Sequence, residues 1–171
     1  MFYQARSFNQ DIGRWDVNSG TDFSYMFVNS SNITYLFNQD IGNWDVSNGT
    51  DFSKMFYGTN IFNSDISNWD VSSATSFDHM FAYTDSFNQD IGRWDVSSVT
   101  SFFSMFSGAT KFNQDISSWD VSNGNSFGSM FSDATYFNQN IRGWDVSGCR
   151  YFTSMFQNAV NFNQDLKKDL G

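Results

Sequence analysis

The stretch FNQDIGRWDVSSVTSFFSMF, residues 87–106, recurs with small changes along the whole chain. The second copy begins 29 residues after the first, and each later copy begins 25 residues after the one before it. A fixed period of about 20 to 50 residues is typical of a solenoid, in which neighbouring coils share a core that no single coil could bury alone. The copies begin at Phe8, Phe37, Phe62, Phe87, Phe112, Phe137 and Phe162.

Apolar residues recur at fixed places in each copy. In the quoted copy, Ile91, Trp94 and Val96 form the pattern apolar-x-x-apolar-x-apolar. Its last part alternates with period two, as a half-buried strand does, so we predict a short parallel strand at each Trp-Asp-Val. Further on, Phe102, Met105 and Phe106 have the i, i+3, i+4 spacing of one helical face, which predicts a short helical or 3-10 segment.

These patterns predict a leucine-rich-repeat-like solenoid of about six 25-residue coils, each a short parallel strand plus a short helical or 3-10 segment. We expect a single solenoid domain over residues 1–171, with a partial repeat at 1–7 and a terminal partial repeat from 162. The first coil should expose apolar edge surface, and the more polar DLKKDLG at 165–171 should act as a partial cap.

The segment FNQDIGNWDVSNGTDFSKMFYGT, residues 37–59, and its sister copies resemble the repeats of BspA-like bacterial surface proteins and mycoplasma-type lipoproteins. The resemblance rests on the combined FNQDI, WDVS and MF spacing and covers nearly the whole chain. Phe replaces that family's Met at the start of the predicted helical segment, a change that affects core packing. The resemblance implies a solenoid on the cell surface or outside the cell, linked with adhesion, and it implies no catalytic residues.

Composition argues against several classes of protein. The formal charge of −9, from 18 acidic and 9 basic residues, argues against a nucleic-acid binder, which needs clustered Lys and Arg. No apolar run is long enough for a membrane-spanning helix. The single His79 is expected to be a variable surface residue and the single Cys149 an inert core residue, so no enzyme is predicted.

The Asp of each Trp-Asp-Val triplet is the residue that core packing does not explain. With Trp and Val inward, it should point outward, and like charges on strands about 4.8 Å apart repel one another. Arg14 and Arg93 could relieve two coils, while Ser hydroxyls or backbone N–H groups could hold the others. A structural role, a basic or polar partner and weak Ca²⁺ binding all remain open, although a flat Asp row supplies few of the oxygens that Ca²⁺ needs. The column comprises Asp16, Asp45, Asp70, Asp95, Asp120 and Asp145.

Two further polar columns follow each opening Phe. The Asn directly after it is expected to form a buried structural ladder, bonding the backbone of its own coil and of its neighbour. The Asp two residues later is replaced by Asn140 in one copy, which keeps an oxygen acceptor without the charge and therefore favours a turn over a metal site. The Asn-x-Ser/Thr sites at Asn29 and Asn32 fall in the extra residues of the first copy, where we expect a surface loop.

The sequence thus favours a non-enzymatic, surface-displayed binding or adhesion module that uses its acidic strand face on a protein or glycan ligand. The alternative is a structural spacer, or a segment of a longer repeat protein that associates end to end. Binding to a regular surface such as ice is disfavoured, because the Thr column at Thr21, Thr50, Thr75 and Thr100 fails at Asn125 and Arg150. No cofactor is expected.

Overall fold

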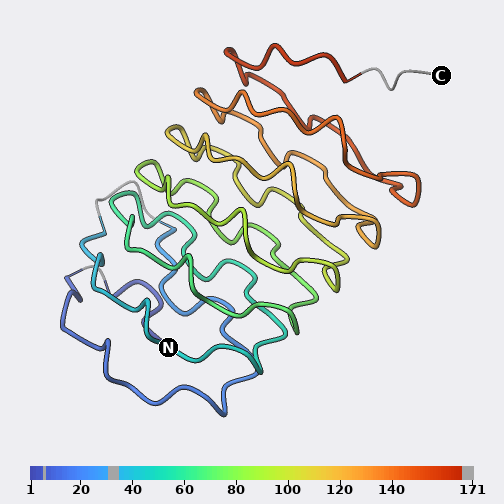
Figure 1. The fold of residues 1–171 in the computed structure, drawn as a ribbon. Helices are drawn as coiled ribbons and strands as arrows, with labels where there is room; N and C mark the ends of the chain where they lie inside the picture. Colours follow the sequence, from blue (N-terminus) through green and yellow to red (C-terminus); the bar gives the residue numbers. More distant parts are fainter. Residues whose placement is uncertain (6, 31–34, 167–171) are drawn as a thin grey trace.

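The computed structural model describes residues 1–5, 7–30 and 35–166. Figure 1 shows the chain winding into a stack of coils that runs from the N-terminal residues in blue to the C-terminal residues in red. Among the described residues there is no helix, and β-structure is limited to isolated parallel bridges. The bridges pair Asp22 with Asp51, Asp51 with Ser76, Ser76 with Ser101, Ser101 with Ser126, and Ser126 with Tyr151.

The segment predicted to be helical is a row of turns. Met55 N–H donates to the carbonyl of Phe52, three residues back, at 3.1 Å. Phe56 N–H donates at 3.0 Å to the carbonyl of Met80 in the next coil, where an α-helix would return it to Phe52. Between them, Lys54 has φ of +57°, a left-handed conformation that a continuous right-handed helix excludes. The helical prediction was therefore wrong, because alternate N–H groups leave the segment to join the next coil.

The strand predicted at Trp-Asp-Val is also absent. Trp44 N–H donates to the carbonyl of Ile41 at 3.1 Å, and Gly49 N–H donates to that of Val46 at 2.7 Å. Between these two turns, Ser47 N–H donates to the Asp45 carboxylate at 3.1 Å. These N–H groups are used within their own coil, so they form no ladder with a neighbour. The side-chain directions are nevertheless as predicted, with Trp44 and Val46 buried and Asp45 exposed.

Columns of stacked aromatic rings fill the core. Phe56 lies 5.6 Å from Phe81 in the next coil, and Phe62 lies 6.2 Å from Phe87, both with nearly parallel rings. The two columns interleave, because Phe81 stacks on Phe87 at 3.9 Å. Each such pair contributes about 0.5–1.5 kcal/mol beyond its burial. The repeat therefore stabilises itself mainly by stacking each coil on the next.

Polar bonds between coils run in two opposite directions. The N–H groups of the Phe-x-x-Met-Phe segment donate to the coil that follows, as Phe56 does. On the other side, Asn88 N–H donates to the side-chain oxygen of Asn63 in the preceding coil at 2.8 Å, and Trp94 Nε1–H donates to the Ile66 carbonyl at 3.2 Å. The Asn bond recurs from Asn9 to Asn163, which confirms the predicted ladder, although its members are exposed or half-buried rather than buried.

Asn29 of the first copy does not lie in a surface loop, contrary to our prediction. This residue is only 2% exposed, and its N–H donates to the Tyr57 carbonyl at 2.8 Å. Asn29 is therefore a core residue of the coil-to-coil contact and not an accessible glycosylation acceptor. Asn32 lies outside the described residues.

Candidate functional site

Each Asp of the Trp-Asp-Val column is exposed and closes a tight turn. Asp95 Oδ1 accepts the backbone N–H of Ser97 at 3.0 Å and the Ser97 hydroxyl at 2.6 Å. An Asp side chain bonded to a backbone N–H two residues on is an Asx turn. The same backbone bond occurs at all six members of the column: Asp16, Asp45, Asp70, Asp95, Asp120 and Asp145. Backbone bonds of this kind are what we expect if the Asp column has a structural role.

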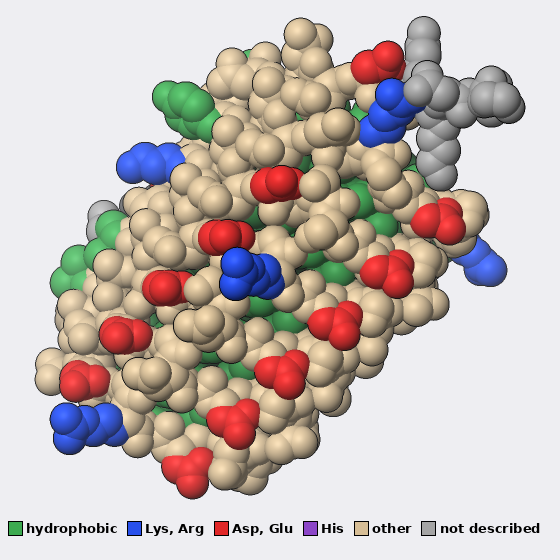
Figure 2. Space-filling model, in the orientation of Figure 1, with side chains coloured by type: hydrophobic (Ala, Val, Ile, Leu, Met, Phe, Trp, Pro, Cys, Tyr) green, Lys and Arg blue, Asp and Glu red, His purple; other side chains and the backbone are tan. Residues whose placement is uncertain are grey.

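The second Asp column forms Asx turns as well. Asp90 Oδ1 accepts the N–H of Gly92 at 3.0 Å, and at the exceptional position Asn140 Oδ1 accepts the N–H of Arg142, also at 3.0 Å. The turn role predicted for this column is confirmed, and Asn140 shows that an uncharged amide can hold the same turn. Figure 2 shows two rows of acidic side chains crossing one face of the stack, with apolar side chains visible between them. We call this surface the acidic face and define it by these two Asp columns.

Hydrogen bonds offset the repulsion along the row. The Ser97 hydroxyl, together with the Ser97 N–H, lowers the pKa of Asp95 below its ordinary value of 3.8. The Ser122 side chain and N–H likewise lower the pKa of Asp120, although its neighbours Asp95 and Asp145 act in the opposite direction. At Asp120 the local donors therefore outweigh the like charges of the adjacent coils.

The exclusive use of Asp as the acidic residue also favours a turn role for the Asp columns. The chain contains no Glu, so all of its 18 acidic residues are Asp. A site that needed only negative charge would accept either residue, whereas an Asx turn needs the short side chain of Asp or Asn. Turn geometry thus accounts for the repeated Asp, and the exposed carboxylates are a consequence that a partner could use.

The flanking arginines do not offset the repulsion between the Asp carboxylates, a possibility that we had considered. Neither Arg14 nor Arg93 forms an ion pair with a described residue, and both are exposed. The Ser hydroxyls that the sequence analysis considered as donors do bond the carboxylates, as Ser72 and Ser97 show. Within the described ranges, no group of three or more Asp, Glu, His or Cys has the geometry to hold a metal ion.

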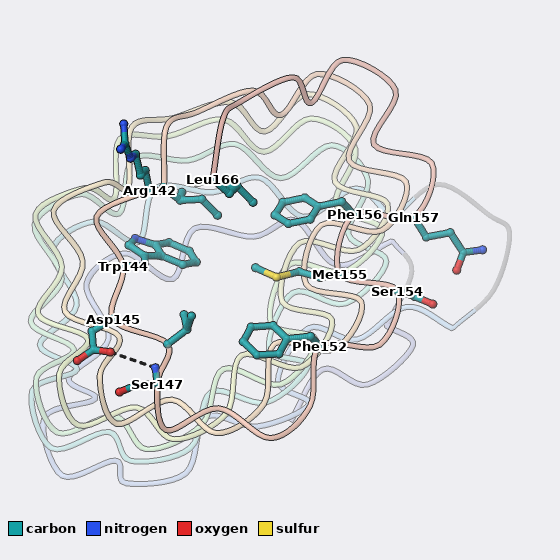
Figure 3. Close-up of a pocket in the computed structure, with 12 residues that line it drawn as sticks. Arg142, Trp144, Asp145, Ser147, Phe152, Ser154, Met155, Phe156, Gln157 and Leu166 are labelled. Carbon is teal, nitrogen blue, oxygen red and sulfur yellow. Dashed lines mark hydrogen bonds between the residues drawn. The ribbon is translucent and has the colours of Figure 1, made fainter. Parts of the chain in front are cut away.

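A large cavity lies at the C-terminal end of the stack. Its volume is about 730 Å³, and Figure 3 shows Trp144, Phe152, Met155, Phe156 and Leu166 around it. Phe152 is 43% exposed, whereas the matching Phe102 and Phe127 of the interior coils are fully buried. Of the predicted cap, only Asp165 and Leu166 are described, and Leu166 forms part of the cavity wall.

A smaller, polar pocket interrupts the repeat on the side of the stack. It has a volume of about 270 Å³, and its lining includes Tyr57, Asn60, Tyr83 and Asp85. The Asn60 Oδ1 atom is buried and accepts a hydrogen bond from no described residue. Burial, and secondarily Tyr83, raise the pKa of Tyr57 above its ordinary value. Since other copies place Ser107 or Ser132 where Tyr57 stands, this pocket is not a property of every coil.

The residues considered for catalysis occupy different surroundings. His79 is half-buried with φ of +56°, and its ring lies 5.1 Å from that of Phe103, so it is not the surface residue that we predicted. Burial, and secondarily Lys54, lower its pKa below 6.5. Cys149 is partly buried, with its Sγ 3.4 Å from the Asn125 carbonyl oxygen. The two side chains lie in different coils and form no common site.

Comparison with known proteins gives one family. The model of the family described as "Mycoplasma protein of unknown function, DUF285" matches twice, over residues 1–91 and 75–169. No curated protein and no solved structure matches the chain. In the part of the chain that the structure describes, no helix has the length and apolar character needed to cross a membrane.

Proposed function

This chain belongs to a repeat-containing Mycoplasma family of unknown function, and we propose, from the geometry of its acidic face, that it is a non-enzymatic binding module that presents this face to a basic partner. The proposal includes a leucine-rich-repeat-like solenoid over residues 1–171, displayed at the cell surface or outside the cell. Support for that location comes from the resemblance of the FNQDI, WDVS and MF spacing to BspA-like adhesion proteins.

The observation that carries the proposal is the fixed orientation of exposed carboxylates. In the bonds of both Asp columns, Oδ1 accepts the turn N–H, as in Asp45 and Asp90. The carboxylates are therefore ordered before any partner arrives, which reduces the entropy lost on binding. Two regular rows on one face, in a chain of net charge −9, would attract a basic surface and fix its register.

The partner that this chemistry fits best is a protein with regularly placed Lys or Arg side chains. Cationic N–H groups form shorter and stronger hydrogen bonds to carboxylates than neutral hydroxyls do. A glycan ligand would use the same carboxylates as hydrogen-bond acceptors, with less dependence on salt.

A matched pair of triple variants tests the acidic face. One variant carries Asp70→Asn, Asp95→Asn and Asp120→Asn, and Asn140 shows that Asn preserves this kind of turn. The other variant carries Asp51→Asn, Asp85→Asn and Asp133→Asn, outside the acidic face. Both raise the net charge by three, so a difference between them reports position rather than total charge.

Binding of each chain to immobilised poly-L-lysine, as a basic polymer probe, gives the comparison. We expect roughly tenfold weaker binding for the face variant, since exposed ion pairs contribute about 0.2–1 kcal/mol each. The second variant should lose markedly less affinity. Equal losses in the two variants would show that binding follows net charge alone and would contradict a specific acidic face.

A structural spacer is the second candidate. It is favoured by the uninterrupted columns of stacked rings, which continue from Phe2 and Phe8 at one end to Phe156 and Phe162 at the other. A spacer has no need of a specific acidic face, so the two triple variants should then lose equal affinity for poly-L-lysine. The poly-L-lysine comparison therefore separates the two candidates.

A further inference from the structure

The polar pocket on the side of the stack has two aromatic walls. Its volume is about 270 Å³, and its lining includes Tyr57 and Tyr83 from consecutive coils. The two rings stand edge to face, with their centroids 5.4 Å apart and an angle of 75° between their planes, so they form a corner. The face of an aromatic ring carries partial negative charge and attracts cations.

The repeat makes an exception for Tyr83. The copies on either side place Gly58 and Gly108 at the corresponding position. A Cβ atom on Gly108 would lie only 2.6 Å from the Tyr83 ring, so this ring packs directly on the backbone of that glycine. The side chain of Tyr83 is nevertheless 49% exposed. One side of the ring is therefore supported by the next coil, while much of the rest is accessible to a ligand.

The polar lining of the pocket offers hydrogen-bond acceptors without donors. Asn60 Oδ1 is buried and accepts from no described residue. The Asp85 carboxylate forms no hydrogen bond or ion pair with a described residue either. Asn60 and Asp85 hold the same place in consecutive coils, and Ser86 N–H donates to the Asn60 carbonyl at 2.9 Å, so the two residues are neighbours. A ligand that brings N–H donors would satisfy acceptors that the chain leaves unpaired.

We propose that this pocket binds a primary ammonium group on a short alkyl stem, as found in a lysine side chain or a free alkylamine. Its N–H groups donate to Asn60 Oδ1 and to the Asp85 carboxylate, and its stem packs against the rings of Tyr57 and Tyr83. A neutral alcohol brings a donor without charge, and a quaternary ammonium brings charge without a donor. A protonated amine brings both.

The chain itself already places one ammonium group on this aromatic surface. Lys54 Nζ lies 5.2 Å from the ring centroid of Tyr25 and 6.0 Å from that of Tyr57. Lys54 does not line the pocket, and it forms no ion pair with a described residue. Its charge would repel a cation in the pocket and attract an anion. Lys54→Met should therefore strengthen the binding of an amine, whereas it would weaken the binding of an anionic ligand.

The pocket is separate from the acidic face. Gln157 holds the place of Tyr57 in a later coil, and Figure 3 shows Gln157 on the opposite side of the coil from Asp145, a member of the acidic face. The ammonium site is therefore independent of the proposed binding of a basic partner to the acidic face, and either can fail without the other.

The test is a titration of the full chain with n-butylammonium chloride, followed by proton–nitrogen NMR, with sodium chloride at equal ionic strength as the reference. The amide signals of Gly58 and Tyr83 should shift and saturate, while that of Gly128, in a coil outside the pocket, should not. We expect roughly tenfold weaker binding of 1-butanol and of tetramethylammonium, since each lacks one of the two features.

Titration with Nα-acetyl-lysine N-methylamide distinguishes the two sources of the ammonium group. Tighter binding of this compound than of n-butylammonium indicates a lysine side chain of a polypeptide. Equal or weaker binding indicates a free amine. Either result supports the ammonium site, provided that the signals of Gly58 and Tyr83 report the binding.

A matched pair of single variants tests the role of the carboxylate. Asp85→Asn removes the charge and copies Asn60, the residue at this place in the preceding coil, so the fold should tolerate it. It should weaken n-butylammonium binding roughly tenfold. Asp115→Asn makes the same change of net charge on the acidic face, where Asn140 shows that Asn keeps the turn. This control should bind n-butylammonium like the wild type.

A third variant tests the aromatic wall. Tyr83→Gly copies the glycines of the neighbouring coils, and it suits the φ of +57° at this position better than any larger residue does. It should weaken n-butylammonium binding while the protein still unfolds cooperatively on heating.

Three results would overturn the proposal. The first is the absence of saturable shifts at Gly58 and Tyr83 with n-butylammonium. The second is binding of 1-butanol or tetramethylammonium as tight as that of n-butylammonium. The third is an equal loss of affinity in Asp85→Asn and Asp115→Asn, which would show that the amine follows net charge and not this pocket.

Discussion

Asp95 accepts two hydrogen bonds from Ser97, one from its backbone N–H and one from its hydroxyl, at 3.0 Å and 2.6 Å. The same pair of residue types recurs in neighbouring coils, with Ser47 on Asp45 and Ser72 on Asp70. The first copy has Asn18 in place of Ser, and there only the backbone bond to Asp16 is present. The hydroxyl is therefore an addition to a turn that the backbone bond alone can close.

Removal of the Ser97 hydroxyl should raise the pKa of Asp95. In Ser97→Ala the backbone bond remains, while the larger of the two causes that lower this pKa is lost. Carboxyl-carbon NMR titration of both proteins measures the change, with Asp115 in the other Asp column as an internal reference. An unchanged pKa of Asp95 would show that the hydroxyl contributes nothing to the ionised state.

Stability should fall in two steps as the solution is acidified. The pKa of His79 is lowered from 6.5, so folding favours its neutral form and stability is lost as the pH falls through about 6.5. The pKa values of Asp45, Asp95 and Asp120 are lowered from 3.8, so the stability that their ionised forms add is lost only below that value. Urea unfolding against pH tests both steps, and His79→Gln should abolish the upper step alone.

Replacing a buried Trp whose indole donates a hydrogen bond should lower the free energy of unfolding more than replacing an exposed Trp. Trp119 is 3% exposed and its Nε1–H donates to the Ile91 carbonyl at 3.0 Å. Trp119→Phe removes that donor and should lower the free energy of unfolding by about 1–3 kcal/mol. Trp15→Phe is the matched control, because Trp15 is 42% exposed and its indole donates to no described residue. Equal effects in urea unfolding would contradict a stabilising role for the indole ladder.

Gly58 should tolerate no side chain. Its φ is +70°, and a Cβ atom there would overlap the carbonyl oxygen of Asn29 in the preceding coil. Tyr83 and Asp133 hold the same left-handed place in later coils, so the overlap rather than the dihedral angle should decide the outcome. Gly58→Ala should lower the free energy of unfolding by more than about 1 kcal/mol.

Gly143→Ala is the control for this prediction. A Cβ atom at Gly143 meets no atom within 4 Å, so its effect should stay within about 0.5 kcal/mol. Thermal unfolding of both variants gives the comparison. If Gly58→Ala is as stable as Gly143→Ala, the backbones of the first two coils must be able to move apart.

The sequence predicted which side chains face the core but not how the backbone turns. Trp94 and Val96 are buried and Asp95 is exposed, as period-two alternation required. The same alternation arises when Asx turns flank the triplet, so periodicity alone could not distinguish a strand from this arrangement. The helical prediction failed because Lys54 and Ser104 adopt positive φ, a conformation that non-glycine residues rarely signal in advance.

The candidate site was predicted in part. Its carboxylates were identified by their repetition, and Asn140 correctly indicated a turn role for one column. For the other column, a Ser two residues after the Asp in five of the six copies, from Ser47 to Ser147, indicated a possible hydroxyl donor, and this hydroxyl bonds Asp45, Asp70 and Asp95. The polar pocket beside Tyr57 could not be predicted, because it depends on contacts between several coils.

The opposite directions of the inter-coil bonds have an electrostatic consequence. In an α-helix all peptide dipoles add along one axis, so the two ends carry partial charges. Here Phe56 N–H points toward the following coil, while Asn88 N–H and the Trp94 indole point toward the preceding one. The dipoles on the two sides of each coil therefore oppose one another along the stack. An array of such repeats should accumulate a weaker axial field at its ends than an α-helix of the same length, in which all peptide dipoles add.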